Sequence, residues 1–295
     1  MALRTHITER QRRLGSELRK LRESAGLSVN AASAQIGMGA AHLSHIEAAR
    51  TAITADRLTA LLHTYNVRSE PYSLALASLS ESDGKGWWTE FRKSLPQHSL
   101  DLAELEARAA GIQSYETLLI PGLLQTEAYM RALFYSSRPG ASPAEIETLV
   151  AYRRARQQIL ADDSSTALHA IIHEAALRIT IGGSDVMRGQ LTHLLRAAQR
   201  PRTTIQVLPF DAGARAWFGT PLLILGSEVS GLETVFLEHP AEPLLLGDDE
   251  SIARYRSTFD SLKRNSLPPV SDEGPPGSHE QRDSWGLIHH VLYTF

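Results

Sequence analysis

The sequence predicts an α+β protein made of two domains, an N-terminal all-α domain of four to five short helices and a larger C-terminal α+β domain. Three observations lead to this prediction. Short helical patterns interrupted by glycine fill the first 68 residues, short β-like runs appear beyond residue 165, and the two regions carry charges of opposite sign. A length of 295 residues with 42% hydrophobic residues is enough for two packed cores.

The charge is divided unevenly along the chain, although the formal net charge is only −3. Residues 1–68 hold ten Lys and Arg against five Asp and Glu, a net charge of +5, and the remainder holds 20 against 28, a net charge of −8. A basic end on an acidic chain indicates a polyanionic partner for that end. A solvated basic helix is the alternative.

Four amphipathic segments follow one another in the first domain. Their apolar residues recur at helical spacing, as Leu14, Leu18 and Leu21, then Ala32 and Ile36, then Leu43 and Ile46, then Leu58, Leu61 and Leu62. Gly26 is placed to end the first helix, Ser28 and Thr54 can cap the second and fourth, and glycines 37 and 39 separate the second from the third. Two short helices joined by a tight glycine-bearing turn form a helix-turn-helix.

Four blocks run without gaps through residues 11–67: Leu14-x3-Leu18-x2-Leu21, Gly26-Leu27-Ser28, Ile36-Gly37-Met38-Gly39 and Leu43-Ser44-x-Ile46-Glu47. They resemble the helix-turn-helix domain of phage-repressor type (XRE, Cro/CI-like), which implies double-stranded DNA as the partner of residues 1–68. By this resemblance the base-contacting residues are Ala40, Ala41, His42, Ser44 and His45. The residues expected to contact the DNA backbone are Arg10, Arg12, Arg13, Arg19, Ser28, Asn30 and Arg50. The resemblance also implies a structural ion pair between Arg22 and Glu47.

The helix-turn-helix departs from the usual pattern of these domains at the start of its first helix and at the start of its recognition helix. Val29 stands where glutamine is common, and Ala40 and Ala41 replace polar residues. Alanine can contact a thymine methyl group but makes no bidentate hydrogen bond. Direct readout is therefore expected from His45 and His42, with DNA shape contributing more than usual.

Composition divides the rest of the chain into three segments. Residues 69–86 are expected to form a connecting helix and linker, and residues 87–266 an α+β regulatory or partner-binding domain. Residues 267–295 are expected to form a Pro/Gly-rich linker with an apolar tail. Trp87 and Trp88 are expected to anchor the start of the second domain. Residues 100–160 are interpreted as helices. Beyond them, short strands are predicted at residues 168–173, 203–208, 221–225, 234–237 and 244–246, with helices from about 184 to 195 and from about 249 to 263.

The second domain also contains ordered blocks, including Leu105-Glu106-x-Arg108-Ala109, Ile120-Pro121-Gly122-Leu123-Leu124-Gln125-Thr126, Arg153-x-x-Arg156-Gln157 and Val207-Leu208-Pro209. These blocks resemble an uncharacterised, antitoxin-like C-terminal domain found on many actinobacterial helix-turn-helix regulators. The resemblance implies a homodimeric transcription regulator that senses a small-molecule effector or a protein partner. An antitoxin-like interaction protein, which sequesters a small partner encoded nearby and regulates its own synthesis, is the alternative.

Motifs for catalysis are lacking, so no catalytic residue, metal site or cofactor is expected. His173-Glu174 does not continue to a second histidine, because Leu177 occupies that position of the zinc-protease motif. A Ser–Lys self-cleavage pair would have to use Lys263, which is predicted near a helix end beside Arg264. The basic run at residues 152–156 is interpreted as a solvated or ion-paired helix face near Glu145 and Glu147.

Composition also predicts the compartment and the behaviour of the tail. The sequence has no cysteine, no signal-peptide pattern and no apolar run approaching the ~20 residues of a membrane span, which favours a cytoplasmic protein without a membrane partner. Residues 267–284 are interpreted as a linker. The apolar residues 285–295 are interpreted either as a strand that docks on its own domain or a neighbour, or as a chance extension.

Overall fold

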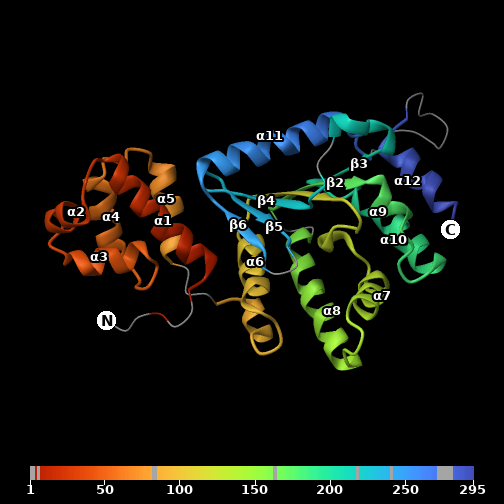
Figure 1. Cartoon of the computed structure of the whole chain (residues 1–295), viewed down its shortest axis with the longest axis horizontal. Helices are drawn as coiled ribbons and strands as arrows, with labels where there is room; N and C mark the ends of the chain where they lie inside the picture. The colour runs from red at the N-terminus through yellow and green to blue at the C-terminus, as the bar shows by residue number, and fades with distance from the viewer. Residues whose placement is uncertain are drawn as a thin grey trace. The chain divides into compact units, whose positions relative to one another are not determined.

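The computed structural model describes residues 4, 7–81, 85–161, 165–216, 219–239, 242–270 and 282–295. They fall into two compact units, one of Met1–Thr89 with Ser99–Leu105 and one of Glu90–His98 with Glu106–Phe295 (Figure 1). Helices dominate the first unit, and the second combines a six-stranded sheet with helices. The predicted α+β class is therefore confirmed.

The described residues up to 81 form five helices. These are α1 (Glu9–Ser24), α2 (Val29–Gln35), α3 (Ala40–Glu47), α4 (Ala55–Thr64) and α5 (Glu70–Ser80). Thr8 caps α1 in a reciprocal capping box with Gln11, and Gly26 follows the helix with a φ of +70°, as its predicted role requires. The large apolar side chains that are almost completely buried come from four of the five helices: Leu18, Leu43, Leu58, Leu61 and Leu76.

Helix α5 packs against α1 and α4 and so belongs to the helical unit rather than to a linker. Its single fully buried residue, Leu76, joins the core of that unit. Residues 82–84 of the expected linker lie outside the described residues. A short 3-10 helix, η1 (Trp87–Phe91), follows, in which Trp88 is buried and Trp87 is half-buried.

The second unit contains one mixed sheet in the order β3-β2-β1-β4-β5-β6. Its strands are β1 (Gly111–Glu116), β2 (Ala167–His173), β3 (Thr203–Leu208), β4 (Leu222–Gly226), β5 (Thr234–Leu237) and β6 (Leu244–Leu246). The first three strands are parallel, and each remaining pair is antiparallel. Because two antiparallel steps separate β1 from β5, these strands run in the same direction and end at the same edge of the sheet.

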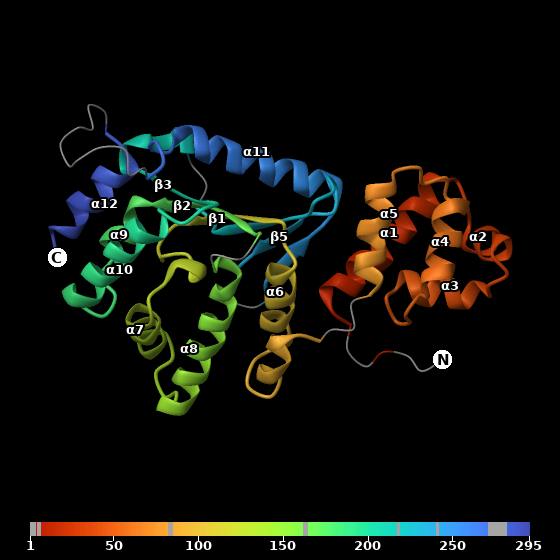
Figure 2. The same cartoon turned by 180° about the vertical axis from the view of Figure 1, so that it is seen from behind.

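The described residues from 87 onward also contain helical segments before, between and after these strands. They are α6 (Gln97–Ala107), η2 (Gly122–Leu124), α7 (Glu127–Ser137), α8 (Pro143–Gln157), η3 (Gln158–Leu160), α9 (Glu174–Arg178), α10 (Ser184–Ala197), η4 (Phe210–Ala216), α11 (Asp249–Asn265) and α12 (Ser284–Leu292), with η1 named above. In both views α11 lies on one side of the sheet, and α7 and α8 lie on the other (Figures 1 and 2). Thr126 caps α7 and Asp248 caps α11.

Strand β1 corrects the prediction that residues 100–160 are helical throughout. Leu102, Leu105, Ala109 and Ile112 have helical spacing, but the helix ends at Ala107 and Ile112 belongs to a strand. Both faces of β1 are covered, since the adjacent residues Ser114 and Tyr115 are each almost completely buried. The strand has only two large apolar side chains, Ile112 and Tyr115, and Ile112 continues the preceding helical spacing, so no strand pattern stands out. The five other strands lie at the predicted places.

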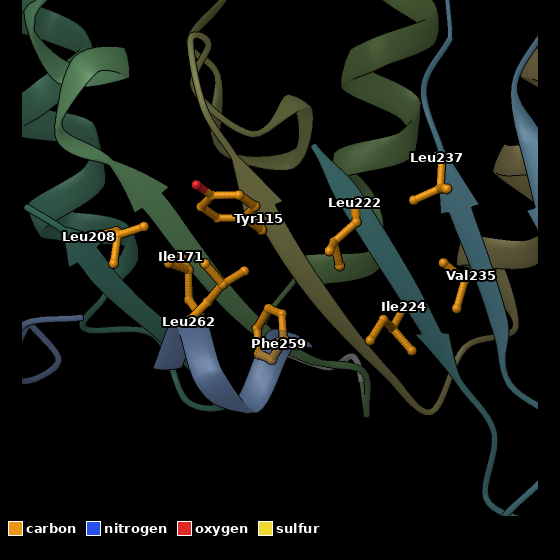
Figure 3. Close-up of a cluster of buried hydrophobic side chains, with 9 residues drawn as sticks. All are labelled: Tyr115, Ile171, Leu208, Leu222, Ile224, Val235, Leu237, Phe259 and Leu262. Carbon is orange, nitrogen blue, oxygen red and sulfur yellow. The ribbon is translucent and has the colours of Figure 1, made fainter. Parts of the chain in front are cut away.

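The core beneath α11 is continuous across the sheet. Figure 3 shows Phe259 and Leu262 of α11 lying against side chains from neighbouring strands, among them Tyr115 and Ile171. Its members are Tyr115, Ile171, Leu208, Leu222, Ile224, Val235, Leu237, Phe259 and Leu262. Tyr115 thus points to the α11 side, and its neighbours Ser114 and Glu116 point to the opposite side of the sheet.

The tail is a helix, which corrects the predicted strand. Asp283 caps α12, and Leu287, Ile288 and Val291 are buried where the helix packs beside α10, α9 and β3. The chain before it also covers β3, an edge strand, because the amides of Leu267 and Val270 donate to carbonyls of that strand. Residues 271–281 of the expected linker lie outside the described residues.

Candidate nucleic-acid interface

Helices α2 and α3 with the turn between them form the helix-turn-helix. The hydroxyl of Ser28 accepts a 3.1 Å hydrogen bond from the amide of Ala31, which fixes the start of α2. The turn passes through Gly37, whose φ of +63° is accessible to glycine without strain. Ala32 is completely buried, so its small side chain permits the close crossing of the two helices.

Helix α3 presents one face outward because its other face is anchored. Leu43 and Ile46 are buried at 0% and 3% exposure, while Ala41 and Ser44 are exposed. Ala40, His42 and His45 are half-buried beside them. The structure therefore brings the five predicted base-contacting residues onto one short helix, with Ala41 and Ser44 the most accessible.

His42 is less available than its sequence position suggests. Its Nε2 atom is buried and has no hydrogen-bond partner among the described residues. Burial lowers the pKa of the His42 imidazole, and the nearby positive charge of Arg57 on α4 lowers it further. His45 carries no such burial of a ring nitrogen, so it is the better candidate for a hydrogen bond to a base edge.

Helix α3 is tied to α1 at its C-terminal end. The Arg22 guanidinium donates to the Glu47 carboxylate through Nε at 2.7 Å and Nη2 at 3.0 Å, and through Nη1 to the carbonyl of Leu27 at 2.8 Å. Both charged side chains are almost fully buried. Burial also raises the pKa of the neighbouring Tyr65 hydroxyl to about 12, with the negative charge of Glu47 adding to the effect.

A glycine that sequence reasoning missed sets the distance between α1 and α3. A Cβ atom at Gly15 would lie 2.4 Å from the carbonyl oxygen of Glu47. No larger side chain fits at this crossing without moving backbone. The signal was present in the sequence as an isolated glycine inside a strongly helical pattern.

The predicted backbone contacts divide into two groups. Arg12, Arg19, Ser28, Asn30 and Arg50 are exposed. Arg12 and Arg19 form surface ion pairs with Glu9 and Glu23, which a phosphate can replace at little cost because such pairs are weak.

Arg10 and Arg13 are a correction to the predicted set. They are 7% and 9% exposed. Arg10 donates to the carbonyl of Ser78 at 3.0 Å, and Arg13 pairs at 3.1 Å with Glu17, which accepts a hydrogen bond from Tyr72. These two arginines connect α1 with α5 inside the unit, so we do not retain them as phosphate contacts.

The described residues contain neither a metal site nor a membrane span. No group of three or more His, Cys, Asp or Glu side chains among them could hold a metal ion. His173 instead caps α9, accepting from the amide of Ala175. None of the described helices has the length and apolar character that a bilayer-crossing segment needs.

Comparison with known families gives two matches along the chain. Residues 13–71 match a helix-turn-helix domain, which supports DNA binding. Residues 100–271, more than half of the chain, match a domain of unknown function, DUF5753. Comparisons with curated proteins and with solved structures give no match. The chain is therefore a helix-turn-helix protein that belongs to the DUF5753 family.

Proposed function

We propose that this protein is a sequence-specific transcription regulator of phage-repressor type that places α3 in the major groove of DNA. The observation that carries the proposal is the exposed face of α3 on a helix held by the buried Leu43 and Ile46 and by the Arg22–Glu47 pair. A recognition helix must be held rigidly, because base readout depends on side chains positioned to within a fraction of an ångström.

Sequence preference is assigned mainly to His45 and to DNA shape. Ala40 and Ala41 offer methyl groups that suit thymine, and Ser44 offers a short hydroxyl compatible with several bases. Affinity is assigned to the exposed cations Arg12, Arg19 and Arg50. Their contacts with phosphates are independent of sequence and sensitive to salt.

The remaining parts of the proposal concern assembly and control. We propose that a homodimer binds two half-sites, because a single α3 covers only a few base pairs. The second unit then acts as the regulatory module, which responds to an effector by binding it unequally in two states of the protein. In this role the protein is a cytoplasmic regulator and not an enzyme.

The experiment that tests the function is selection of binding sites from random duplex DNA by the full-length protein, followed by footprinting on the selected sequence. We expect enrichment of a two-fold symmetric site with half-sites about 10 base pairs apart, bound by two protomers. Equal affinity for all duplexes at every salt concentration would contradict it. Purification from the native host serves as a second test, because a stoichiometric small protein partner would favour the antitoxin-like role over effector sensing.

A further inference from the structure

Several polar side chains gather at one edge of the sheet in the second unit, where the parallel strands end. Glu116 is the last residue of β1, and Glu238 directly follows β5, which ends at the same edge. Arg153 and Arg156 of α8 approach the same place, since each acts electrostatically on Glu116. In open sheets with parallel strands, ligands bind outside the carboxyl ends of the strands.

Glu116 is a carboxyl group without a direct partner in the described part of the chain. It lies deep in the unit, yet its oxygen atoms are not among the fully buried polar atoms that lack a partner, so they keep contact with solvent. Burial raises the pKa of Glu116 to about 8, and the negative charge of Glu238 contributes, against the opposing effects of Arg153 and Arg156. Near neutral pH this carboxyl group is therefore mostly protonated and can donate a hydrogen bond.

Arg153 is a half-buried cation that no described carboxylate neutralises at ion-pair distance. Its neighbours on α8 are paired, Arg154 with Glu127 at 2.9 Å and Arg156 with Glu106 at 2.6 Å. Arg153 instead donates one hydrogen bond of 2.5 Å to Gln125 Oε1. This arrangement corrects the sequence interpretation of the basic run as uniformly solvated or ion-paired.

The guanidinium of Arg153 is held in place while most of its donors remain unused. It lies 4.6 Å from the centroid of the Phe134 ring, and burial lowers the pKa of Arg153 to about 10. A guanidinium has five N–H donors, of which the interaction with Gln125 uses one. Tyr129 is completely buried, and its hydroxyl accepts from the amide of Ile120 at 3.3 Å, so it supports the loop before α7 from inside the unit.

The loop between β1 and α7 is fixed around this cluster by glutamine side chains. Gln125 donates to the carbonyl of Ile120 at 2.7 Å, and Gln157 donates to the carbonyls of Gly122 and Gln125. A Cβ atom at Gly122 would lie within 4 Å of both Arg153 and Arg156. The backbone of η2 thus approaches the two guanidinium groups closely, and the donors around Arg153 have a fixed geometry.

We propose that Arg153 and Glu116 form a binding site for a small molecule that carries an oxyanion, either a carboxylate or a phosphate-type group. The guanidinium supplies charge and a forked pair of donors that match an oxyanion. The protonated Glu116 supplies a neutral donor beside it. This proposal rests on the effector sensing proposed above, and it specifies the chemical class of the effector.

Calorimetric titration of the full-length protein without DNA tests the site, with succinate as the carboxylate probe and sulfate as the tetrahedral probe at constant ionic strength. We expect at least one probe to bind saturably and more tightly than chloride. The probe with the higher affinity shows whether the oxyanion of the ligand is a carboxylate or a phosphate-type group. Arg153→Gln is expected to weaken binding about tenfold or more, because it removes the charge-assisted hydrogen bonds. Arg154→Gln is the matched control on the next residue, and it should leave the affinity unchanged.

The pH dependence supplies a second readout that a merely structural role of Arg153 would not produce. Between about pH 7 and about pH 9 both probes stay ionised, so the loss of the Glu116 proton should weaken binding as the pH rises through about 8. Glu116→Gln keeps a neutral donor and should bind with little dependence on pH over this range.

Three results would overturn the site: no saturable binding of either anion, unchanged binding by Arg153→Gln, or an affinity that increases with pH. If Arg153→Gln fails to fold, the pH dependence of anion affinity in the wild-type protein and in Glu116→Gln still tests the site. Because DNA is absent from these titrations, their failure leaves the proposed DNA binding untouched, and a failure of DNA binding leaves this site untouched.

Discussion

The guanidinium of Arg22 on α1 holds the carboxylate of Glu47, the last residue of α3, through two hydrogen bonds of 2.7 and 3.0 Å. Arg22→Gln leaves this buried carboxylate without its cation. We expect a loss of about 2 to 3 kcal/mol in the free energy of unfolding, because charged hydrogen bonds of this kind are costly to leave unmade. Chemical denaturation followed by circular dichroism measures it. Arg19→Gln, which breaks an exposed pair on the same helix, should leave the transition midpoint unchanged, and equal effects of the two variants would contradict the assignment.

The close approach at Gly15 predicts sensitivity to a single methyl group. Gly15→Ala introduces a Cβ atom 2.4 Å from the carbonyl oxygen of Glu47. The expected cost is about 1 to 3 kcal/mol, since overpacking outweighs the better helix propensity of alanine. Ser16→Ala, at an exposed position next in the chain, is the control and should be neutral or slightly stabilising. A Gly15→Ala protein as stable as the wild type would mean that α1 and α3 do not cross this closely.

Arg12 and Arg13 are adjacent in sequence but should behave differently on DNA. Arg12 is exposed, and its replacement by alanine is expected to weaken DNA binding across all sequences and to lower the salt slope by about one unit. Arg13 is buried against Glu17, so Arg13→Ala should lower the stability of the helical unit and leave the salt slope unchanged. Fluorescence anisotropy at several salt concentrations, together with thermal unfolding, separates the two effects. If Arg13→Ala lowered the salt slope and Arg12→Ala did not, Arg13 would be the phosphate contact.

The half-buried ring of His42, with its buried Nε2 atom, predicts a pH dependence of stability. Burial lowers the pKa of His42 in the folded protein below its ordinary value of 6.5, so folding disfavours the protonated ring. The contribution of the neutral ring to the free energy of unfolding is fully present above pH 6.5. It is lost as the pH falls through the lower pKa that His42 has in the folded state. His42→Gln should therefore lose less stability than the wild type between about pH 7 and about pH 5. His63→Gln, at an exposed position, should follow the wild-type curve, and identical curves for all three proteins would contradict the burial of His42.

Sequence reasoning located the helices of the first unit because each has a signal of its own. Leu14 and Leu18 repeat at helical spacing, Ser28 caps α2, and Gly26 ends α1. These local rules act within a few residues and do not depend on the rest of the fold. Strands β2 to β6 were found because each contains a short run rich in apolar residues. Strand β1 was missed because it has only two large apolar side chains, Ile112 and Tyr115, and Ile112 continues the helical spacing of the preceding segment.

The features that sequence reasoning missed depend on contacts between distant residues. The burial of Arg13 depends on Glu17 and Tyr72, and the tight crossing at Gly15 depends on the backbone of α3. Arg153 could not be distinguished from Arg154 by composition, because only the fold shows which of the two has a carboxylate partner. The tail helix was ambiguous because an apolar run of that length suits either a strand or a buried helix.

The most direct test of the central claim, that α3 binds DNA, places a negative charge on its outer face. Ser44→Glu should reduce affinity for the selected DNA site at least about tenfold, because a carboxylate in the major groove is repelled by the phosphates and leaves few bases to contact. Ser257→Glu, exposed on α11 of the second unit, makes the same change in net charge and should bind as the wild type does. Equal affinities of the two variants would contradict the account and move the DNA-binding surface away from α3.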